Sequence, residues 1–281
     1  MAQGLLSYET FVKSVAGASG SIIAMSVFYP LDTIRFRLQI EDDNAKELKK
    51  MNSLHAVYHI IRTEGIEALY RGMKPVLQSL GASNFVYFYT FHGLKSITTG
   101  SALHDLGLGM IAGMANVLAT LPLWVVNSRL KANKSEHFSG LLDGVVHIAQ
   151  KEGVSALWNG LGPSLMLVIN PAIHFAVYEA LKRNVKTSSA TVFFLFGAIS
   201  KAVATVATYP IQLAQARQRH GKNSQMSTAA LLLSILKRNG PAALFQGMEA
   251  KLLQTVLTAA LFFMTYEKIV RFVFMLLMRK G

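Results

Sequence analysis

One short pattern occurs three times in this chain of 281 residues, and it constrains the fold more than any other feature. Each copy ends an apolar run with a proline and continues as a more polar stretch; the prolines are Pro30, Pro122 and Pro210. A second pattern follows each proline at a similar distance: Glu64-Gly65 with Tyr70-Arg71-Gly72, Glu152-Gly153 with Trp158-Asn159-Gly160, and Asn239-Gly240 with Phe245-Gln246-Gly247. Such self-similarity over the whole length indicates one structural unit repeated three times.

The apolar runs between these patterns predict membrane-spanning helices. No Asp, Glu, Lys or Arg occurs in residues 14–31, 75–94, 106–128, 153–178 or 252–266, and residues 187–216 carry only Lys201. A bilayer core needs roughly 20 apolar residues per helix. We therefore predict an all-α membrane protein with six transmembrane helices, two in each repeat. The repeats cover about 1–101, 102–188 and 189–281.

Each repeat is expected to be a kinked helix, a short surface helix and a second long helix. A proline inside a helix removes one backbone hydrogen bond and crowds the preceding turn, so kinks are expected at Pro30, Pro122 and Pro210. The amphipathic stretches 54–62, 140–150 and 228–237 predict the surface helices. Three equal hairpins most simply close into a ring with a pseudo-threefold axis, and such a ring encloses a cavity that can be shut at either end.

Charge and composition narrow the classes of partner. The chain has 28 Lys and Arg against 15 Asp and Glu, a formal net charge of +13. In a chain so rich in apolar sequence, this excess favours membrane lipid headgroups and small anions over nucleic acid. The absence of cysteine excludes disulfides and thiolate chemistry. His55 and His59 have helical spacing but no acidic third ligand nearby, so we predict no metal, no resident cofactor and no catalytic site.

One charge inside an apolar run indicates a ligand site. Lys201 lies eleven residues before Gln212, which on a helix places both side chains on the same inward face. A charge at the centre of a membrane helix costs at least about 2.5–3.5 kcal/mol. We therefore expect Lys201 to face the cavity and to bind a phosphate group; a structural role, with the charge held by backbone carbonyls, is the alternative.

The repeated patterns resemble those of the mitochondrial carrier family, whose members carry Pro-x-Asp/Glu-x-x-Lys/Arg and then Glu/Asp-Gly-x-x-x-aromatic-Lys/Arg-Gly. The resemblance covers the whole chain. It is greatest with the peroxisomal branch of the family, through the stretches 83–91, 122–127, 170–173 and 249–260. It implies a monomeric transporter that works by alternating access. The cargo would be CoA, FAD, NAD or AMP- and ATP-like adenine-containing cofactors, exchanged across the peroxisomal membrane.

Two alternatives remain open at this stage. The first is a carrier in the mitochondrial inner membrane with NAD, FAD, folate or pyrimidine nucleotides as cargo. The second is a carrier-shaped membrane scaffold that binds partners and transports nothing, which the loss of charges from the motifs favours. The beginning of the chain resembles neither a transit peptide nor a secretory signal. With the peroxisomal reading, an import receptor for peroxisomal membrane proteins is an expected partner.

The family resemblance also implies two gates. On the organelle side, motif residues of neighbouring repeats would pair as Asp32 with Asn127, Trp124 with Gln215, and Gln212 with Arg35, with Gln39 as a brace. On the cytosolic side, the pattern aromatic-Asp/Glu-x-x-Lys/Arg implies a second gate, in which Glu267 with Lys95 is the expected pair. The remaining members of that gate would be His92, Glu179 and Lys182.

The substrate contacts that the resemblance implies are on the second helix of each repeat. They correspond to Ser79, to Leu167 with Val168, and to Gln254. The apolar pair suits an adenine face, and the two polar side chains suit hydrogen bonds to the base and ribose. Asn84 and Asn116 also fall near the inward face; contact with a neighbouring helix is the alternative role for both.

Overall fold

The computed structural model describes residues 22–40, 48, 51–98, 100–132, 140–184, 190–221 and 226–278, and no strand occurs among them. Residues 22–27 are helical and precede α2. The α-helices are α2 (Tyr29–Gln39), α4 (Ser53–Glu64), α5 (Met73–Ile97), α6 (Ala102–Ala132), α7 (Leu141–Glu152), α8 (Leu161–Met166), α9 (Asn170–Asn184), α10 (Ala190–His220), α11 (Thr228–Asn239) and α12 (Met248–Met278). Four short 3₁₀ helices lie between them: η1 (Ile66–Leu69), η2 (Val154–Trp158), η3 (Leu167–Ile169) and η4 (Pro241–Phe245).

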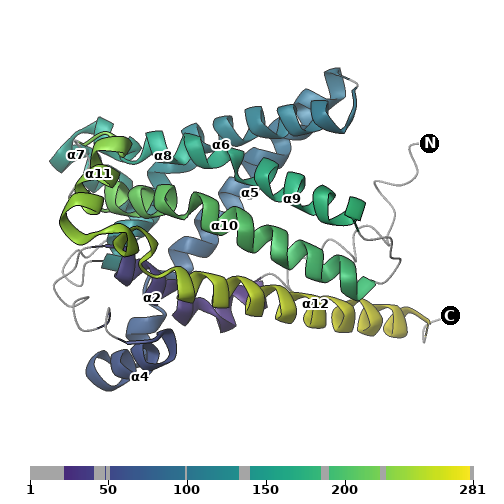
Figure 1. The fold of residues 1–281 in the computed structure, drawn as a ribbon, viewed down its shortest axis with the longest axis horizontal. Coiled ribbons are helices and arrows are strands. Elements are labelled where there is room, and N and C mark those ends of the chain that lie inside the picture. Colours follow the sequence, from purple (N-terminus) through teal and green to yellow (C-terminus); the bar gives the residue numbers. More distant parts are fainter. Residues whose placement is uncertain are drawn as a thin grey trace.

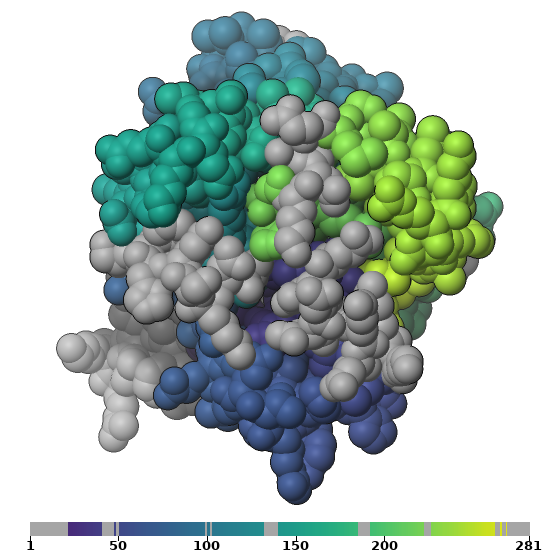
Figure 2. Space-filling view, turned by 90° about the vertical axis from the view of Figure 1, so that its left-hand side faces the viewer, coloured from purple at the N-terminus to yellow at the C-terminus, as the bar shows by residue number. Residues whose placement is uncertain are grey.

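The order of elements repeats three times, which confirms the predicted fold class. A helix (α2, α6 or α10) leads to a surface helix (α4, α7 or α11), a 3₁₀ turn and a further helical stretch (α5, α8 to α9, or α12). In the second repeat this stretch is not the single helix predicted, because η3 interrupts it. The surface helices gather at one end of the molecule, and the long helices run away from that end (Figure 1). Seen from that end, the three repeats form three lobes around a common centre (Figure 2).

Three helical segments in the described residues are long and apolar enough to cross a membrane: Leu103–Lys131, Val154–Asn184 and Val192–His220. By length alone α5, with 25 residues, and α12, with 31 residues, also meet the requirement. The predicted first span lies partly in residues 1–21, which are outside the described part of the chain. Helices or helical segments of membrane-spanning length are therefore present in each repeat, and three segments also have clear membrane character.

Proline acts differently in the first repeat. Residues 22–27 are helical, Phe28 is a turn, and the helix resumes at Tyr29. Pro30 thus occupies the first turn of α2, where its missing N–H is tolerated. Pro122 and Pro210 instead lie inside continuous helices. The helix is thus interrupted at Phe28, before the proline, and kinks at the three prolines stay a prediction.

The glycines of the second pattern hold the backbone in a conformation that other residues rarely adopt. Their φ angles are positive in all three repeats: 83°, 90° and 76° at Gly65, Gly153 and Gly240, and 76°, 82° and 80° at the three closing glycines. At Gly247 a Cβ atom would also lie 3.1 Å from the carbonyl oxygen of Arg35. Both constraints favour glycine, and they explain why the pattern survives in each repeat.

Each repeat has its own apolar core, which fastens the surface helix to the first long helix. Ile34, Ile60 and Leu69 belong to the first core, where α2, α4 and η1 meet. The second and third repeats use residues at matching positions: Val126, Ile148 and Leu157, and then Ala214, Ile235 and the partly buried Leu244.

In the first two repeats, an arginine of the proline-containing helix forms an ion pair with the glutamate of the second pattern. Arg37 donates to Glu64 at 2.6 and 3.2 Å. Arg129 makes the same paired contact with Glu152, one of its bonds being 2.7 Å long. These hydrogen bonds hold the pKa of Glu152 below its usual value. The third repeat has Asn239 in place of the acid. There the corresponding arginine, Arg217, donates to the backbone carbonyl of Gln39 in the first repeat, at 2.9 Å.

Candidate functional site

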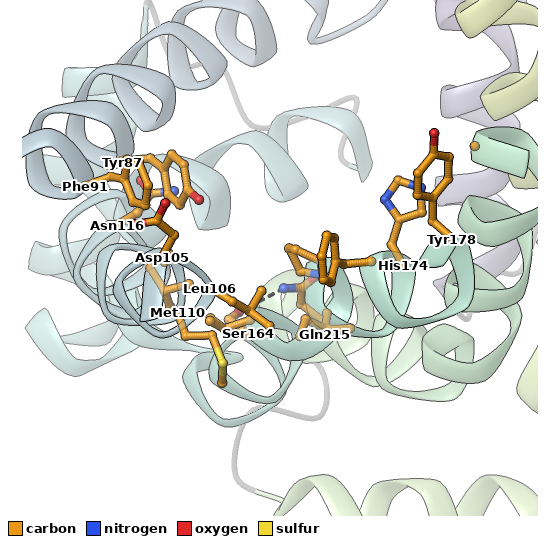
Figure 3. Close-up of a pocket in the computed structure, with 18 residues that line it drawn as sticks. Tyr87, Phe91, Asp105, Leu106, Met110, Asn116, Ser164, His174, Tyr178 and Gln215 are labelled. Atoms are coloured by element: carbon orange, nitrogen blue, oxygen red, sulfur yellow. Dashed lines mark hydrogen bonds between the residues drawn. The ribbon is translucent and has the colours of Figure 1, made fainter. Parts of the chain in front are cut away.

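A cavity of about 920 Å³ lies between helices of all three repeats. Tyr87 and Phe91 of α5 line one side, and His174 and Tyr178 of α9 line the other (Figure 3). Most of the remaining lining is apolar and comes from α6, α8, η3 and α9. A cavity with this volume and with aromatic and aliphatic walls is typical of sites for medium-sized organic ligands.

The cavity is polar at both ends. At one end Asp105, which belongs to the lining, accepts a hydrogen bond from the ammonium of Lys95 at 2.7 Å. At the other end the side-chain amide of Gln215 donates to the hydroxyl of Ser164 at 3.0 Å (Figure 3). Gln215 also lines a second, smaller cavity, so the two spaces adjoin at this side chain.

The smaller cavity, of about 240 Å³, is called the gate chamber below, and it is rich in positive charge. Four cationic side chains line it: Arg35 from α2, Lys131 from α6, Arg219 from α10 and Lys251 from α12. The acidic residue in the lining is Asp32. The chamber therefore has a surplus of three positive charges. It adjoins the larger cavity at Gln215, and this end of the larger cavity is called its inner end below.

Asp32 joins the first two repeats through a buried ion pair. Its carboxylate accepts a hydrogen bond from the ammonium of Lys131, and both residues are buried. The guanidinium of Arg35 approaches the same carboxylate at 3.3 Å. The ammonium of Lys131 also lies 4.7 Å from the ring centroid of Tyr29, a cation–π distance. Charge, hydrogen bonding and ring contact together hold α6 against α2.

All seven residues predicted for the organelle-side gate line this chamber, but their partners differ from those expected. The set is Asp32, Arg35, Gln39, Trp124, Asn127, Gln212 and Gln215. Asn127 donates to Ser79 at 2.7 Å instead of meeting Asp32. Gln212 donates to Thr208 of its own helix at 3.1 Å instead of meeting Arg35.

The other members of that set also contact different groups. The indole of Trp124 donates to Ser83 at 2.9 Å, while its expected partner Gln215 bonds to Ser164. The amide of Gln39 donates to the hydroxyl of Tyr209 at 3.1 Å, and thereby braces the first repeat against the third. The gate role of these residues stays a proposal.

Three cations of the chamber were not predicted as site residues. Lys131 and Arg219 lie one helical turn after Asn127 and Gln215. Because side chains on a helix point toward its N-terminus, a long side chain reaches the turn before its own Cα atom. The ammonium of Lys131 therefore reaches Asp32. In the same way the guanidinium of Arg219 donates, at 3.1 Å, to the Ser164 hydroxyl that also accepts from Gln215. The signal in the sequence is a basic residue nine positions after the proline.

The predicted substrate contacts separate into three groups. Leu167, Val168 and Asn116 line the larger cavity, whereas Gln254 lines the gate chamber. Ser79 is fully buried and serves as the acceptor for Asn127.

The remaining two predicted contacts are exposed and do not belong to either lining. Asn84 is an exposed residue of α5. Lys201 is exposed on α10, near enough to Lys251 for their charges to repel each other.

The predicted cytosolic gate is described only in part. Lys95 pairs with Asp105 of α6. The side chain of its expected partner, Glu267, lies outside the described residues. Glu179 and Lys182 approach each other at 3.8 Å within α9. His92 is exposed, and its ring stacks on Phe88 with centroids 6.2 Å apart. The described residues contain no group of three His, Cys, Asp or Glu side chains placed to hold a metal.

Comparison with known proteins agrees with this architecture. Residues 7–102, 98–189 and 186–276 each match the mitochondrial carrier protein family. The chain is 48% identical to peroxisomal membrane protein PMP34 of Mus musculus, with 94% of each chain covered. It is 32% identical to peroxisomal adenine nucleotide carrier 1 of Glycine max (93% and 91% covered) and 29% identical to the peroxisomal nicotinamide adenine dinucleotide carrier of Arabidopsis thaliana (94% and 96%).

Three tandem repeats with the same helical plan, two adjoining cavities between them and a family match in each repeat lead to one assignment. The protein is a transporter of the peroxisomal membrane and not an enzyme, and the chain belongs to the mitochondrial carrier protein family.

Proposed function

We propose that the protein exchanges adenine-containing cofactors and nucleotides, namely CoA, FAD, NAD and AMP- or ATP-like molecules, across the peroxisomal membrane by alternating access. The observation that carries the proposal is an apolar, aromatic cavity whose inner end adjoins a surplus of three positive charges. A cargo with a flat base at one end and phosphates at the other matches both halves. Of the three relatives named above, two have names that state a cargo, NAD in one and adenine nucleotides in the other.

The lining of the larger cavity supports this orientation. Leu167 and Val168 offer apolar contact to a base, and the amide of Asn116 lies in the same lining to bind its edge or the ribose. The phosphates would then point toward Gln215 and the gate chamber. Lys201 lies on α10, as Gln215 does, and would bind a phosphate as the cargo moves past it. One copy of the chain supplies both cavities, which supports a monomer as the transport unit.

The scaffold alternative keeps one observation in its favour. Among the described residues of the gate chamber, Asp32 with Lys131 is the one ion pair that joins two repeats. A gate with few such pairs could belong to a protein that no longer transports. Measured exchange separates the two functions.

The test is exchange by the purified protein in liposomes. Labelled AMP is offered outside vesicles that contain CoA, FAD, NAD, AMP or adenosine. We expect uptake against the phosphorylated compounds and none against adenosine. Uptake equal to that of protein-free vesicles, by a protein shown to be folded, would contradict transport and favour the scaffold.

The matched variants are Lys201→Gln and Lys237→Gln. Lys237 is exposed on the surface helix α11, away from both linings. A hydrogen bond to a charged group contributes about 1.5–3 kcal/mol, so the loss of Lys201 should lower the exchange rate roughly 10- to 150-fold. The control should exchange at the wild-type rate. Equal rates for Lys201→Gln and wild type would remove Lys201 from the site but leave the transport proposal intact.

A further inference from the structure

The gate chamber holds more positive charge than its own carboxylate compensates. The two carboxylate oxygens of Asp32 are engaged by Lys131 and Arg35. Arg219 donates to a neutral hydroxyl at 3.1 Å and lies 5.9 Å from the ring centroid of Trp124, so its charge has no carboxylate partner among these contacts. The positive charge of this chamber is therefore only partly compensated by the protein.

Two arginine groups at the chamber carry the clearest mark of this imbalance. The Nε–H groups of Arg35 and Arg219 are both buried, and neither has a hydrogen-bond acceptor within the described protein. Buried N–H groups are paired in the great majority of native proteins. Because both side chains line the same small chamber, one acceptor placed between them could satisfy both groups.

The chamber also presents acceptors. The amide oxygens of Asn127 and Gln254 are buried there without a donor, and these two residues are only 2% and 8% exposed. A fully deprotonated anion would satisfy the arginines but not these oxygens. A singly protonated tetrahedral oxyanion would satisfy both kinds of group, because it has several acceptor oxygens and one O–H donor.

We propose that the gate chamber is a binding site for one inorganic hydrogen phosphate ion, held by Arg35, Arg219 and Lys251. The O–H group of the ion donates a hydrogen bond to the amide oxygen of Gln254 or Asn127. The volume of about 240 Å³ lies below the range of about 300–1,000 Å³ that organic ligands require, which suits an inorganic ion. Its two negative charges reduce the surplus of the chamber from three to one.

This ion is distinct from the cargo of the larger cavity. The three proposed ligands come from α2, α10 and α12, that is, from the first and third repeats. An ion held between them would draw the two repeats together at the inner end of the cavity. Free phosphate should therefore stabilise the closed chamber in the absence of any nucleotide.

Thermal unfolding of the full-length protein in detergent tests the site. Sodium phosphate at low millimolar concentration is compared with sodium sulfate and sodium chloride at equal ionic strength and pH 7.5. We expect phosphate to raise Tm saturably, by about 3 °C or more at ten times its Kd, and sulfate to raise it less. Equal curves for phosphate and chloride would overturn the proposal. Equal curves for phosphate and sulfate would overturn the role of the proton.

Variants separate this site from the general stabilising effect of phosphate salts. Lys251→Gln and Arg219→Gln should lose the phosphate response, and Lys237→Gln should keep it. Lys251→Gln removes a cation that repels its neighbours, so the variant should remain folded. A full phosphate response in both chamber variants would refute the assignment. AMP exchange is measured on the same preparations; intact exchange without a phosphate response would sink this inference and leave the proposed function standing.

Discussion

Removal of the Lys131 ammonium should weaken the structure strongly, because it takes from the buried Asp32 carboxylate the cation that donates a hydrogen bond to it. Lys131→Met keeps most of the aliphatic side chain and its packing while it deletes the charge. Asp32 would then depend on Arg35, which approaches it at 3.3 Å from the same helix. The contact between α2 and α6 would lose its ion pair and the cation–π contact with Tyr29.

The magnitude follows from the burial of both partners. Asp32 is 7% exposed and Lys131 is 8% exposed. Removing one member of a buried pair costs about 3–5 kcal/mol. Because Arg35 still compensates part of the charge, we expect about 3 kcal/mol for Lys131→Met. At roughly 2–4 °C per kcal/mol, Tm should fall by about 6–12 °C.

A double-mutant cycle checks this reasoning. Tm and denaturant unfolding are measured for wild type, Lys131→Met, Asp32→Asn and the double variant, with the exposed Lys237→Met as the control. The double variant has neither member of the pair, so it should be destabilised by less than the sum of the single changes, by about 2 kcal/mol or more. Strictly additive effects, or a Lys131→Met variant as stable as the control, would refute the pairing.

Two further predictions concern the elements that support the gate. Gly247→Ala should destabilise the protein by about 1–3 kcal/mol in thermal unfolding, because φ is 80° and the new Cβ would lie 3.1 Å from the carbonyl oxygen of Arg35; Gly81→Ala, with open space around it, should be neutral or stabilising. Glu152 has a lowered pKa, caused chiefly by hydrogen bonds from Arg129, so its contribution is complete above the ordinary Glu pKa of about 4.5 and is lost as the pH falls through the lowered value. The stability advantage of wild type over Glu152→Gln should therefore be present at pH 7 and shrink below about pH 4.5; an advantage that does not change with pH would contradict this.

The fold could be predicted because its signals are local and occur three times. Positive φ angles at the pattern glycines require no knowledge of distant partners, and the apolar cores use residues at matching positions in each repeat. The acid of the second pattern was visible in the sequence, but its tie to Arg37 or Arg129 was not assigned. That tie depends on how the surface helix folds back on the long helix, which no single stretch encodes.

The gate shows where prediction from spacing ends. The set of residues around the chamber could be predicted from the family resemblance, because the resemblance assigns the motif positions of each repeat to one gate. The pairs could not, because the length of a side chain decides which turn it reaches. Lys131 extends back by one turn and takes the position in front of Asp32 that was expected for Asn127. Asn127, with a short side chain, turns to Ser79 instead.

Lys201 shows a second limit. Periodicity directed it inward, and its charge indeed acts on Lys251, but the side chain is exposed and does not belong to either lining. A charge within an apolar run indicates that the helix faces polar surroundings there. Such a charge does not indicate at which level along the helix axis the ligand binds. Lys251 and Arg219, which lie at the chamber itself, carry no such signal because they are near the polar ends of their helices.

The larger cavity is proposed to be the path of the cargo, and site-directed labelling tests that proposal most directly. The chain has no cysteine, so single cysteines can be introduced without a background. Val168→Cys lies in the cavity lining, and Leu142→Cys lies on the surface helix α7, where the leucine is 78% exposed. Both are labelled with a maleimide in the reconstituted protein, with and without AMP. We predict that AMP protects the cysteine at position 168 and leaves the one at 142 unchanged; equal labelling at position 168 with and without AMP, in a protein that exchanges AMP, would contradict the account.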